Sequence, residues 1–452
     1  MNTALNAPKR ERSFLLFSVL LLLGTAIIFA RNPIALFHPS MFAEDGVWTS
    51  LVYRHGSLAS YWMARLDYLV VGNMMLINLA VAANHAIIGA DDITRLPEAI
   101  AVVSYVFFAA VAALSVVALR SYMSLSARLL LWFLLLLIPV GSSAKEIFGF
   151  VVNVGFSFAF IAVMIVLWRE SFPVRPWRTD LLALDVVLLV CCATNPIVIG
   201  IAGAYLLFRF GVLRGRSIND WLLAAVLLPI AIVDAIGILT VPNDQAGGVI
   251  TASGLVYTAL ARPLLYPLLF PWYDQLNHAL TLILSALLIA LFVLGWRETP
   301  HKRGLGFVLF SAALTTLAIA IQRPNYVQHL SDYATSYPDR YYLAQNLFVL
   351  TAIVWAAEAF MRSGTLRLKA AGSAMVAGLM LVYALNPERI FDFHALRNMT
   401  PAEPAFAQQL RMGRTLQNDP DVMEVDIFPP GWSARYPARF RPEVEASPHK
   451  SS

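Results

Sequence analysis

The chain has 452 residues, of which 59% are hydrophobic and only 13% are charged, and its formal net charge is +5. Soluble domains carry about a quarter charged residues, so this composition excludes a soluble protein and indicates several membrane spans. The basic residues lie in short polar gaps between apolar runs and form no single patch, which argues against a nucleic-acid partner. The two cysteines, Cys191 and Cys192, are adjacent within an apolar run, which excludes a disulfide framework.

Membrane-spanning helices are the first elements to place. A helix needs roughly 20 apolar residues to cross a bilayer core of about 30 Å. By this rule the sequence predicts an all-α integral membrane protein with about eleven spans, near 13–30, 97–119, 128–143, 147–168, 180–194, 196–210, 221–240, 277–296, 305–322, 341–361 and 370–386. The runs at 128–143, 180–194 and 196–210 are short for a span. The first run follows three basic residues and lacks a clear cleavage site, so we expect it to stay as an uncleaved span.

The positions of Lys and Arg set the expected orientation, because cytoplasmic loops are rich in these residues. With the N-terminus inside, every predicted inner loop is basic; the loops contain Arg120 and Arg128; Arg169, Arg175 and Arg178; Arg209, Arg214 and Arg216; Arg297, Lys302 and Arg303; and Arg362, Arg367 and Lys369. We therefore expect a multi-pass protein of the cytoplasmic (inner) membrane with its C-terminus outside. The segment 68–90 is long enough to cross, but a crossing would turn the later basic loops outward. We expect it to form an interfacial or partly re-entrant helix.

These boundaries divide the chain into a polytopic transmembrane domain over 1–386 and an extracytoplasmic tail over 387–452. The first extracytoplasmic loop covers 31–96. The tail is richer in Pro, Arg, Asp and Glu, so we expect a small, partly ordered cap whose last ten or so residues are disordered.

Two adjacent acids in the first loop are the main candidate for chemistry. Glu44 and Asp45 occur in the stretch HPSMFAEDGVWTS. Adjacent residues cannot share a helical face, but Asp before Gly fits a turn or helix start, where one carboxylate points into a cavity and the other caps or orients. Partial desolvation by Phe42 and Trp48 would raise the proton affinity of such a carboxylate, which suits a general base. The alternative is an acidic helix cap in a solvated loop, and spacing alone favours it.

A family resemblance changes this balance. The stretch MFAEDGVW resembles the acidic first-loop signature of membrane glycosyltransferases of the GT-C class, in particular bacterial members with an Ala-Glu-Asp-Gly sequence after the first helix. Those enzymes take the sugar from a polyprenyl phosphate and place an acidic first-loop residue at the reaction centre. The resemblance implies Asp45 as the base and Glu44 as its electrostatic partner or a metal ligand. Some members need a divalent cation and others do not, so both remain open; we find no clear metal set beyond the two acids.

A second stretch, GSSAKEIFGFVVNVGFSFAF, places Lys145 and Glu146 in an outer turn and Asn153 in the next span. Members of the group often have a Glu followed by an Asn at this place. Seven residues make two helical turns, so we expect Glu146 and Asn153 to share a face that lines the acceptor side. The alternative is a Lys-Glu pair that only marks a helix end.

A third stretch, RPNYVQHLSDYATSYPDRYYLAQN, resembles the Arg-Tyr-Tyr start of a late span in these enzymes. Arg340 would hold the donor phosphate, because a guanidinium is a forked and permanently charged partner. Tyr341 would flank the sugar or the prenyl chain, or belong to the interfacial aromatic belt. Arg323 is a second candidate for the phosphate.

Other ionisable residues have simpler explanations. Asp185 and Glu358 lie near the inner ends of predicted spans, where a nearby Arg can pair with them, although an intramembrane acid is a functional candidate by default. Asp234 is deeper and would matter most in a transporter. Arg65 and Asp67 either extend the first-loop site or form a local pair.

The sequence thus leads to one principal hypothesis and one alternative. The first is an inverting, polyprenyl-phosphate-sugar-dependent glycosyltransferase that transfers a hexose or pentose to a cell-envelope glycan or lipid on the outer membrane face, with the donor, the acceptor and membrane lipids as its partners. The alternative is a polytopic transporter or lipid-linked glycan flippase. That class usually shows repeats and broken helices, which we do not find here.

Overall fold

Apolar helices make up most of the protein, whose computed structural model describes residues 7–141, 144–172, 179–211, 217–241, 251–322, 339–391 and 404–442. Within these ranges nine helical segments are long and apolar enough to cross a membrane, and three shorter apolar helices accompany them. The protein is therefore a mostly helical, multi-pass membrane protein. The long segments contain α1 (Ala7–Arg31), α5 (Val71–Ile88), α6 (Leu96–Ala118), α9 (Phe158–Glu170), α12 (Ile218–Thr240), α15 (His278–Glu298), α16 (Lys302–Gln322), α18 (Leu343–Arg362) and α19 (Leu366–Leu385); the short ones are α7 (Leu125–Leu136), α10 (Thr179–Cys192) and α11 (Pro196–Gly211).

Short helices connect and flank these segments. The first loop contains α2 (Ile34–Phe37), α3 (Ala43–His55) and α4 (Ser57–Met63). The other short elements are the 3-10 helices η1 (Leu119–Ser121), η3 (Val152–Ser157), η5 (Phe270–Gln275), η6 (Asp339–Tyr342), η7 (Pro387–Arg389) and η8 (Ala438–Phe440), the π-helix η4 (Tyr257–Leu265), and the α-helices α8 (Ala144–Ile147), α13 (Ala252–Val256), α14 (Tyr266–Leu269) and α21 (Phe406–Met412).

Each of the eleven predicted runs contains one of the described helices, but the run at 147–168 is not a single helix. Its first part consists of a turn and η3, and α9 begins only at Phe158. Gly149 explains the break. Its φ of +93° lies in the left-handed region, and a Cβ at this position would come within 2.4 Å of the Ala35 Cβ. Hydropathy predicted the apolar run correctly, but it carries no information on this backbone turn.

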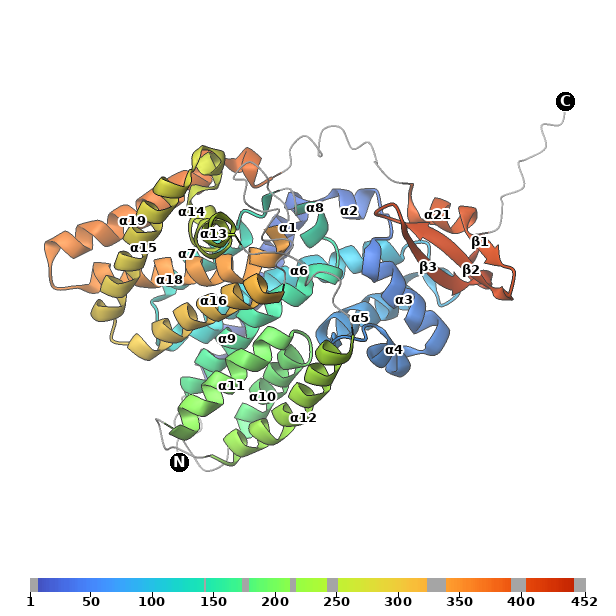
Figure 1. Ribbon diagram of the computed structural model, residues 1–452, viewed down its shortest axis with the longest axis horizontal. Coiled ribbons are helices and arrows are strands. Elements are labelled where there is room, and N and C mark those ends of the chain that lie inside the picture. Colours follow the sequence, from blue (N-terminus) through green and yellow to red (C-terminus); the bar gives the residue numbers. More distant parts are fainter. Residues whose placement is uncertain are drawn as a thin grey trace.

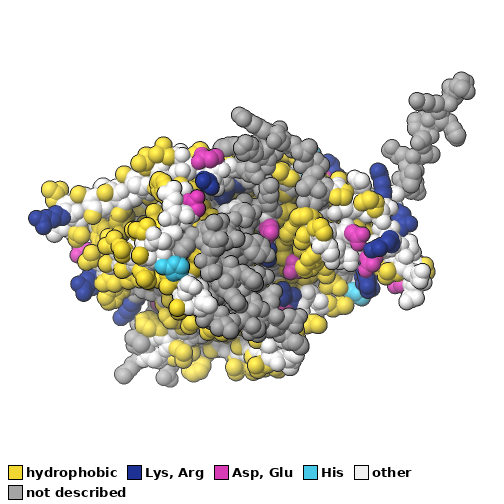
Figure 2. Space-filling view, turned by 45° about the horizontal axis from the view of Figure 1, so that its top comes forward, with side chains coloured by type: hydrophobic (Ala, Val, Ile, Leu, Met, Phe, Trp, Pro, Cys, Tyr) yellow, Lys and Arg dark blue, Asp and Glu magenta, His cyan; other side chains and the backbone are white. Residues whose placement is uncertain are grey.

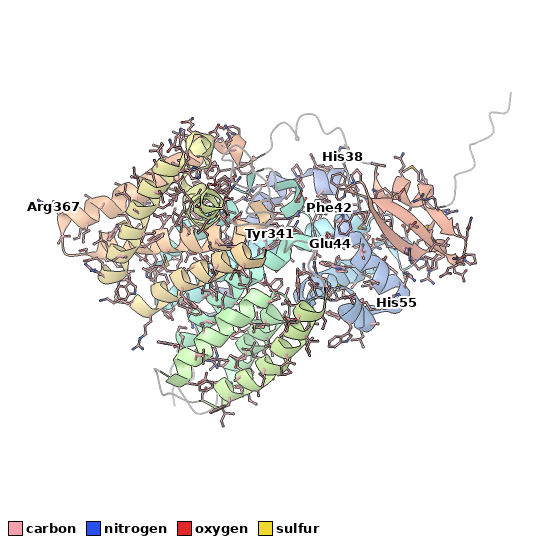
Figure 3. All side chains as sticks on the ribbon, viewed as in Figure 1. His38, Phe42, Glu44, His55, Tyr341 and Arg367 are labelled. Carbon is pink, nitrogen blue, oxygen red and sulfur yellow. The ribbon has the colours of Figure 1, made fainter. Side chains whose placement is uncertain are left out.

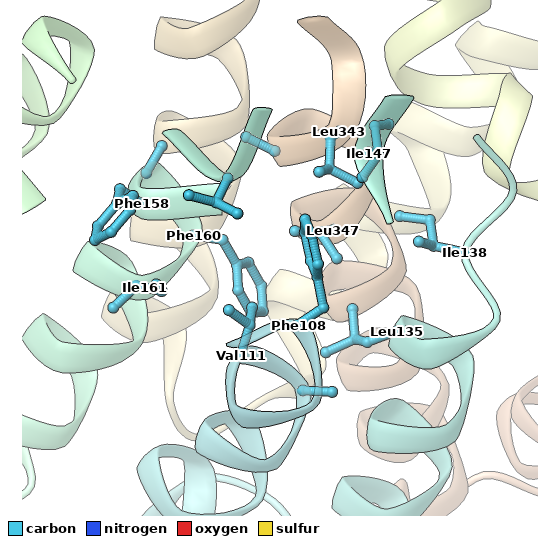
Figure 4. Close-up of a cluster of buried hydrophobic side chains, with 14 of the residues drawn as sticks. Phe108, Val111, Leu135, Ile138, Ile147, Phe158, Phe160, Ile161, Leu343 and Leu347 are labelled. Carbon is cyan, nitrogen blue, oxygen red and sulfur yellow. The ribbon is translucent and has the colours of Figure 1, made fainter. Parts of the chain in front are cut away.

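The core lies around α18, which is buried along its whole length from Leu343 to Phe360. It packs against α7, α9, α15, α16 and α19. Figure 4 shows the centre of this packing, where Phe108 and Phe160 lie beside Leu347. Outer helices such as α12 and α19 instead expose large apolar side chains on one side, as expected for helices that face lipid.

The two ends of the helical body carry different parts of the chain (Figure 1). The loop between α18 and α19 lies at one end, and the first-loop helices α3 to α5 lie at the opposite end with the C-terminal strands. Figure 2 shows hydrophobic side chains over much of the helical body and Lys and Arg side chains at both ends. The α18–α19 loop is therefore separated in space from the first loop and the sheet.

Helix α5 has the length of a span, yet its contacts place its start beside the outer part of α6. The Asn73 side chain donates to the Val151 carbonyl at 2.8 Å, and Ser104 of α6 donates to the neighbouring Phe150 carbonyl at 2.9 Å. These two bonds fix the start of α5 beside α6. The helix is apolar and long enough to span a membrane, and the interfacial helix expected at 68–90 stays a prediction.

The all-α prediction is wrong for the C-terminal tail, which contains a three-stranded antiparallel sheet in the order β1-β2-β3. The strands are β1 (Arg414–Leu416), β2 (Asp419–Ile427) and β3 (Trp432–Pro437). In β2, Met423, Val425 and Ile427 are buried while the acids between them are not, which is the alternation of a strand with one buried face. The overall composition of the tail does not indicate this alternation. The last ten residues, which were expected to be disordered, lie outside the described residues.

The sheet packs on α3 at the sequence Ala-Glu-Asp-Gly. The Tyr436 hydroxyl donates to the Gly46 carbonyl at 3.0 Å and lies 2.7 Å from the Thr49 hydroxyl. A Cβ on Gly46 would come within 2.6 Å of the Ile427 side chain. The glycine of the motif is thus required by close packing between α3 and the tail, and the tail fixes how α3 is rotated.

Candidate functional site

A cavity of about 930 Å³ lies where the ends of several helices meet the first loop and the C-terminal sheet. Figure 3 shows Glu44 of α3 and Tyr341 of η6 near each other in the middle of the molecule, far from Arg367 at the start of α19. The polar lining comes from elements far apart in the sequence and includes Glu44, Arg65, Asp67, Asn73, Glu146, Asn153, Thr194, Asn195, Arg340 and Gln345. Five of the eight predicted site residues line it: Glu44, Glu146, Asn153, Arg340 and Tyr341.

The two acids of the first loop point to different environments. Glu44 is half-buried and lines the cavity, whereas the Asp45 side chain is fully buried and does not line it. They stand at the start of α3, where successive side chains are about 100° apart around the helix axis. The prediction that one acid faces a cavity while the other orients is consistent with this geometry. The placement departs from the predicted roles, because Glu44 and not Asp45 faces the cavity.

Asp45 holds the backbone that forms the opposite wall. Its Oδ2 accepts a hydrogen bond from the Val151 N–H at 2.9 Å. Burial raises the pKa of Asp45 to about 8; the Val151 and Val152 N–H groups act in the lowering direction and the charge of Glu44 in the raising direction. A buried carboxyl group that already accepts from a backbone N–H is well suited to positioning this wall.

We predict that the stability of the protein falls as the pH rises from 6 to 9. An unfolded Asp loses its proton near pH 4, but buried Asp45 keeps it up to about pH 8, so the folded state binds the extra proton between these values. Each pH unit in that window lowers the free energy of unfolding by ~1.4 kcal/mol, and the fall stops above the folded pKa. The expected loss between pH 6 and 9 is ~2–3 kcal/mol.

Thermal unfolding of the purified protein at several pH values measures this effect. Asp45→Asn should remove the slope, because the amide does not titrate, while Glu44→Gln should keep it. If wild type and Asp45→Asn lose stability in parallel, another group is responsible.

The wall segment 146–155 is fixed from several sides. Asn73 donates to the carbonyls of Val151 and Val152 at 2.8 and 3.1 Å, and Asn153 donates to the Glu146 carbonyl at 2.8 Å. Glu146 and Asn153 therefore do meet at the cavity, as predicted. The reason is different, however, because the turn after α8 ends the helix and a side-chain hydrogen bond joins the two residues instead of a shared helical face.

Arg340 reaches the same wall from η6. It forms an ion pair with the Glu146 carboxylate and lies over the Tyr341 ring at 5.4 Å. Tyr341 in turn meets the Phe156 ring edge-on at 5.2 Å. The guanidinium is thus held by a carboxylate and an aromatic face at the edge of the cavity.

Arg65 is a second cavity cation, which the sequence suggested only as one of two alternatives. Its guanidinium makes two hydrogen bonds of 2.8 Å to the Asp67 carboxylate and lies over the Tyr68 ring at 4.5 Å. Burial alone would lower the pKa of Arg65, but the Asp67 hydrogen bond and the charges of Tyr68, Asp67 and Glu44 raise it overall. Both alternatives hold: Arg65 and Asp67 form a local pair, and both line the cavity.

Two predicted site residues cannot be placed. Arg323 lies outside the described residues, and so does the side chain of Lys145, whose backbone belongs to α8. Among the described residues, no three His, Cys, Asp or Glu side chains come together in a way that could hold a metal ion.

The three acids that the sequence analysis singled out within predicted spans have structural partners. Asp234 accepts from the Leu69 N–H at 2.9 Å and so fixes the first loop on α12. Asp185 pairs with Arg169 at 2.8 Å. Glu358 accepts from the Ser124 N–H and pairs with Arg362, both at 2.7 Å. Each acid therefore has a role in holding elements together.

The C-terminal tail contributes a wall that the sequence analysis missed. Pro429 and Trp432, at the turn into β3, line the cavity beside the first loop. The signal for the strands was present in the alternation of β2, but nothing local indicated that their turn would reach a site formed by the first loop.

Neither a scan of the chain against protein-family models nor a search of curated proteins finds a match.

Proposed function

We propose that the protein is an inverting glycosyltransferase that moves a sugar from a polyprenyl phosphate to a glycan or lipid acceptor of the cell envelope. The observation that carries the proposal is the shared cavity, in which a carboxylate, Glu44, and two oriented guanidinium groups, Arg340 and Arg65, line one space. This combination suits a reaction in which one group takes a proton while others stabilise a departing phosphate.

The shape and polarity of the cavity fit a lipid-linked donor. Its polar wall comes from the first loop, the 146–155 segment and η6, while Ile197, Ile238 and Ile319 add apolar surface from the ends of α11, α12 and α16. Ile238 is 44% exposed on the outside of the helical body, so this side is accessible to lipid. A prenyl chain would lie along the apolar side while its phosphate reaches the cations.

The proposed reaction assigns a role to each group. Glu44 takes the proton from the acceptor hydroxyl as that oxygen attacks the anomeric carbon, and the bond from this carbon to the phosphate oxygen breaks with its electron pair going to the phosphate. The donor is a phosphodiester and the leaving group a phosphate monoester, so one negative charge develops there. Arg340 and Arg65 stabilise that charge. Asp45 positions the wall and does not take the proton.

The side of the membrane follows from the charge distribution. Glu44 and Tyr341 of the cavity lie far from Arg367 (Figure 3), and Arg303 is at the other end of α16 from Thr315, which lines the cavity. By the positive-inside rule, this arrangement supports a cavity on the extracytoplasmic face. A donor carried by a lipid suits that face, because the sugar arrives by diffusion within the bilayer.

Sugar transfer in isolated membranes tests the proposal. Membranes that contain the wild-type protein are supplied with radiolabelled polyprenyl-phosphate hexoses and pentoses, and new glycosidic product is measured. Arg340→Gln should lower the rate about 100-fold, because it removes an oriented group that stabilises developing charge. Arg367→Gln, at the opposite end, should have no effect. Movement of the labelled lipid across the membrane without any glycosidic product would contradict the proposal and favour a transporter.

A further inference from the structure

A second cavity, of about 720 Å³, lies at the opposite ends of the helices that line the first. Its walls come from the C-terminal parts of α9 and α11, the N-terminal part of α16 and Tyr122. In α16, Thr315 and Ile319 line the first cavity, whereas the second is lined by residues from Lys302 to Phe310. At 1.5 Å per helical residue, the two linings are ~7.5 Å apart between Phe310 and Thr315, and the cations at Lys302 and Arg303 are ~20 Å from Thr315. The second cavity is therefore a separate site on the side of the basic loops.

The mouth of this cavity carries positive charge. Lys302 and Arg303 are exposed, and neither pairs with a carboxylate in the part of the chain that the structure describes. Glu170 is the one acid among the described lining residues. Its carboxylate accepts from the Tyr205 hydroxyl at 2.6 Å and lies 3.4 Å from Arg209. Tyr205 and Arg209 thus compensate the charge of Glu170 within the wall. Lys302 and Arg303 remain exposed at the cavity.

The deeper wall is apolar and reaches the outside of the helical body. Phe208, Phe307 and Phe310 line it, and Phe310 is 46% exposed. The Arg303 guanidinium lies 5.9 Å from the Phe208 ring, at the boundary between charge and apolar surface. The cavity therefore joins a cationic mouth to a groove that continues toward the lipid.

Two tryptophans hold the turn that leads into α16 and its two cations. Trp296 donates to the Lys302 carbonyl at 2.9 Å, and Trp355 donates to the Thr299 hydroxyl at 3.2 Å. The His301 ring also meets the Tyr122 ring at 5.3 Å. These contacts order the backbone on both sides of the opening before any ligand arrives.

We propose that the second cavity binds an anionic phospholipid of the bilayer, with its phosphate between Lys302 and Arg303 and an acyl chain along Phe208, Phe307 and Phe310. Basic pockets between helices on the cytoplasmic side are well suited to anionic headgroups. A free phosphate would gain binding free energy from the cations alone. A lipid would also gain it from the contact of its acyl chain with the aromatic groove. The site is independent of sugar transfer at the first cavity.

Lipid binding to the full-length purified protein tests this inference. The protein in nanodiscs of phosphatidylcholine is titrated with fluorescent phosphatidylglycerol, and the lipids retained by the protein are counted by native mass spectrometry. Wild type should prefer phosphatidylglycerol to phosphatidylcholine. The double variant Lys302→Gln/Arg303→Gln should bind phosphatidylglycerol about 30-fold more weakly, because each basic residue contributes about fivefold to the affinity.

Two further variants separate this site from general surface charge. Arg367→Gln/Lys369→Gln removes two cations from another loop at the same end and should bind as wild type does. Lys302→Arg/Arg303→Lys keeps the charge and should also keep binding. The inference is overturned if the glutamine pair at 302 and 303 has no effect, if phosphatidylcholine binds equally well, or if soluble glycerol 3-phosphate displaces the lipid at equal concentration.

Discussion

Glu44→Gln is expected to lower the rate of sugar transfer about 10²- to 10⁴-fold, the range lost when a general base is removed. The amide keeps the size of the side chain that lines the cavity but cannot accept the proton of the acceptor hydroxyl. Since Glu44 is half-buried at the cavity wall, the substitution leaves the packing of α3 on the sheet intact. The loss should therefore appear in kcat more than in donor binding.

Asp45→Asn is the matched control for this prediction. Asp45 accepts from the Val151 N–H, and burial raises its pKa to about 8, so near pH 6 the side chain is protonated and Asn resembles it closely. We expect transfer within about tenfold of wild type, less than the loss of a general base. Initial rates with purified protein compare the two variants. An inactive Asp45→Asn beside an active Glu44→Gln would reverse our assignment and restore the role that the family resemblance implies.

Asp220→Ala should destabilise the protein by ~3–5 kcal/mol, because it breaks a buried charge network. Asp220 is fully buried at the start of α12 and lies 2.8 Å from Arg169 and 3.2 Å from Arg209. Its carboxylate also accepts from the Ser217 N–H in a capping box. Without it, two buried guanidinium groups lose a shared counter-charge and the helix loses part of its cap.

The midpoint of thermal unfolding in detergent measures this loss. Asp426→Ala removes one acid from the exposed pair between Arg414 and Asp426, whose side chains are 69% and 77% exposed. Exposed pairs contribute about 0–1 kcal/mol, so the midpoint of that variant should hardly move. Equal shifts in the two variants would mean that the Asp220 network contributes no more than a surface ion pair.

The sequence predicted the helices well because each consists of a long apolar run, and hydropathy measures that property directly. It failed where the decisive contact is distant in sequence or specific to the backbone. The turn at Gly149 depends on the close approach of Ala35, and β2 depends on a partner surface in α3. A period of two is present in Met-Glu-Val-Asp-Ile, but the overall composition of the tail does not indicate it.

The sequence predicted only part of the candidate site, because some of the decisive contacts are again distant in the sequence. Topology alone put the first loop, Glu146 and Arg340 on one side of the membrane, and the structure brings them to one cavity. Which of the two acids faces it depends on the rotation of α3, and the sheet near Tyr436, 390 residues after Gly46, helps to set that rotation. No local sequence pattern indicates a contact between residues so far apart in the chain. The orienting partners of the two cations, Glu146 and Asp67, likewise follow only from the folded chain.

The most direct test of the account asks whether the cavity at Glu44 binds the donor from the side opposite the basic loops. Glu44→Cys is labelled with a charged, membrane-impermeant thiol reagent in sealed vesicles of either orientation; Cys191 and Cys192 are buried and should not react. We predict labelling from the face opposite Arg367, slowed by added polyprenyl-phosphate sugar, while Arg367→Cys reacts from the other face and is unaffected by the donor. Labelling of Glu44→Cys from the Arg367 face, or at a rate that the donor leaves unchanged, would contradict the account.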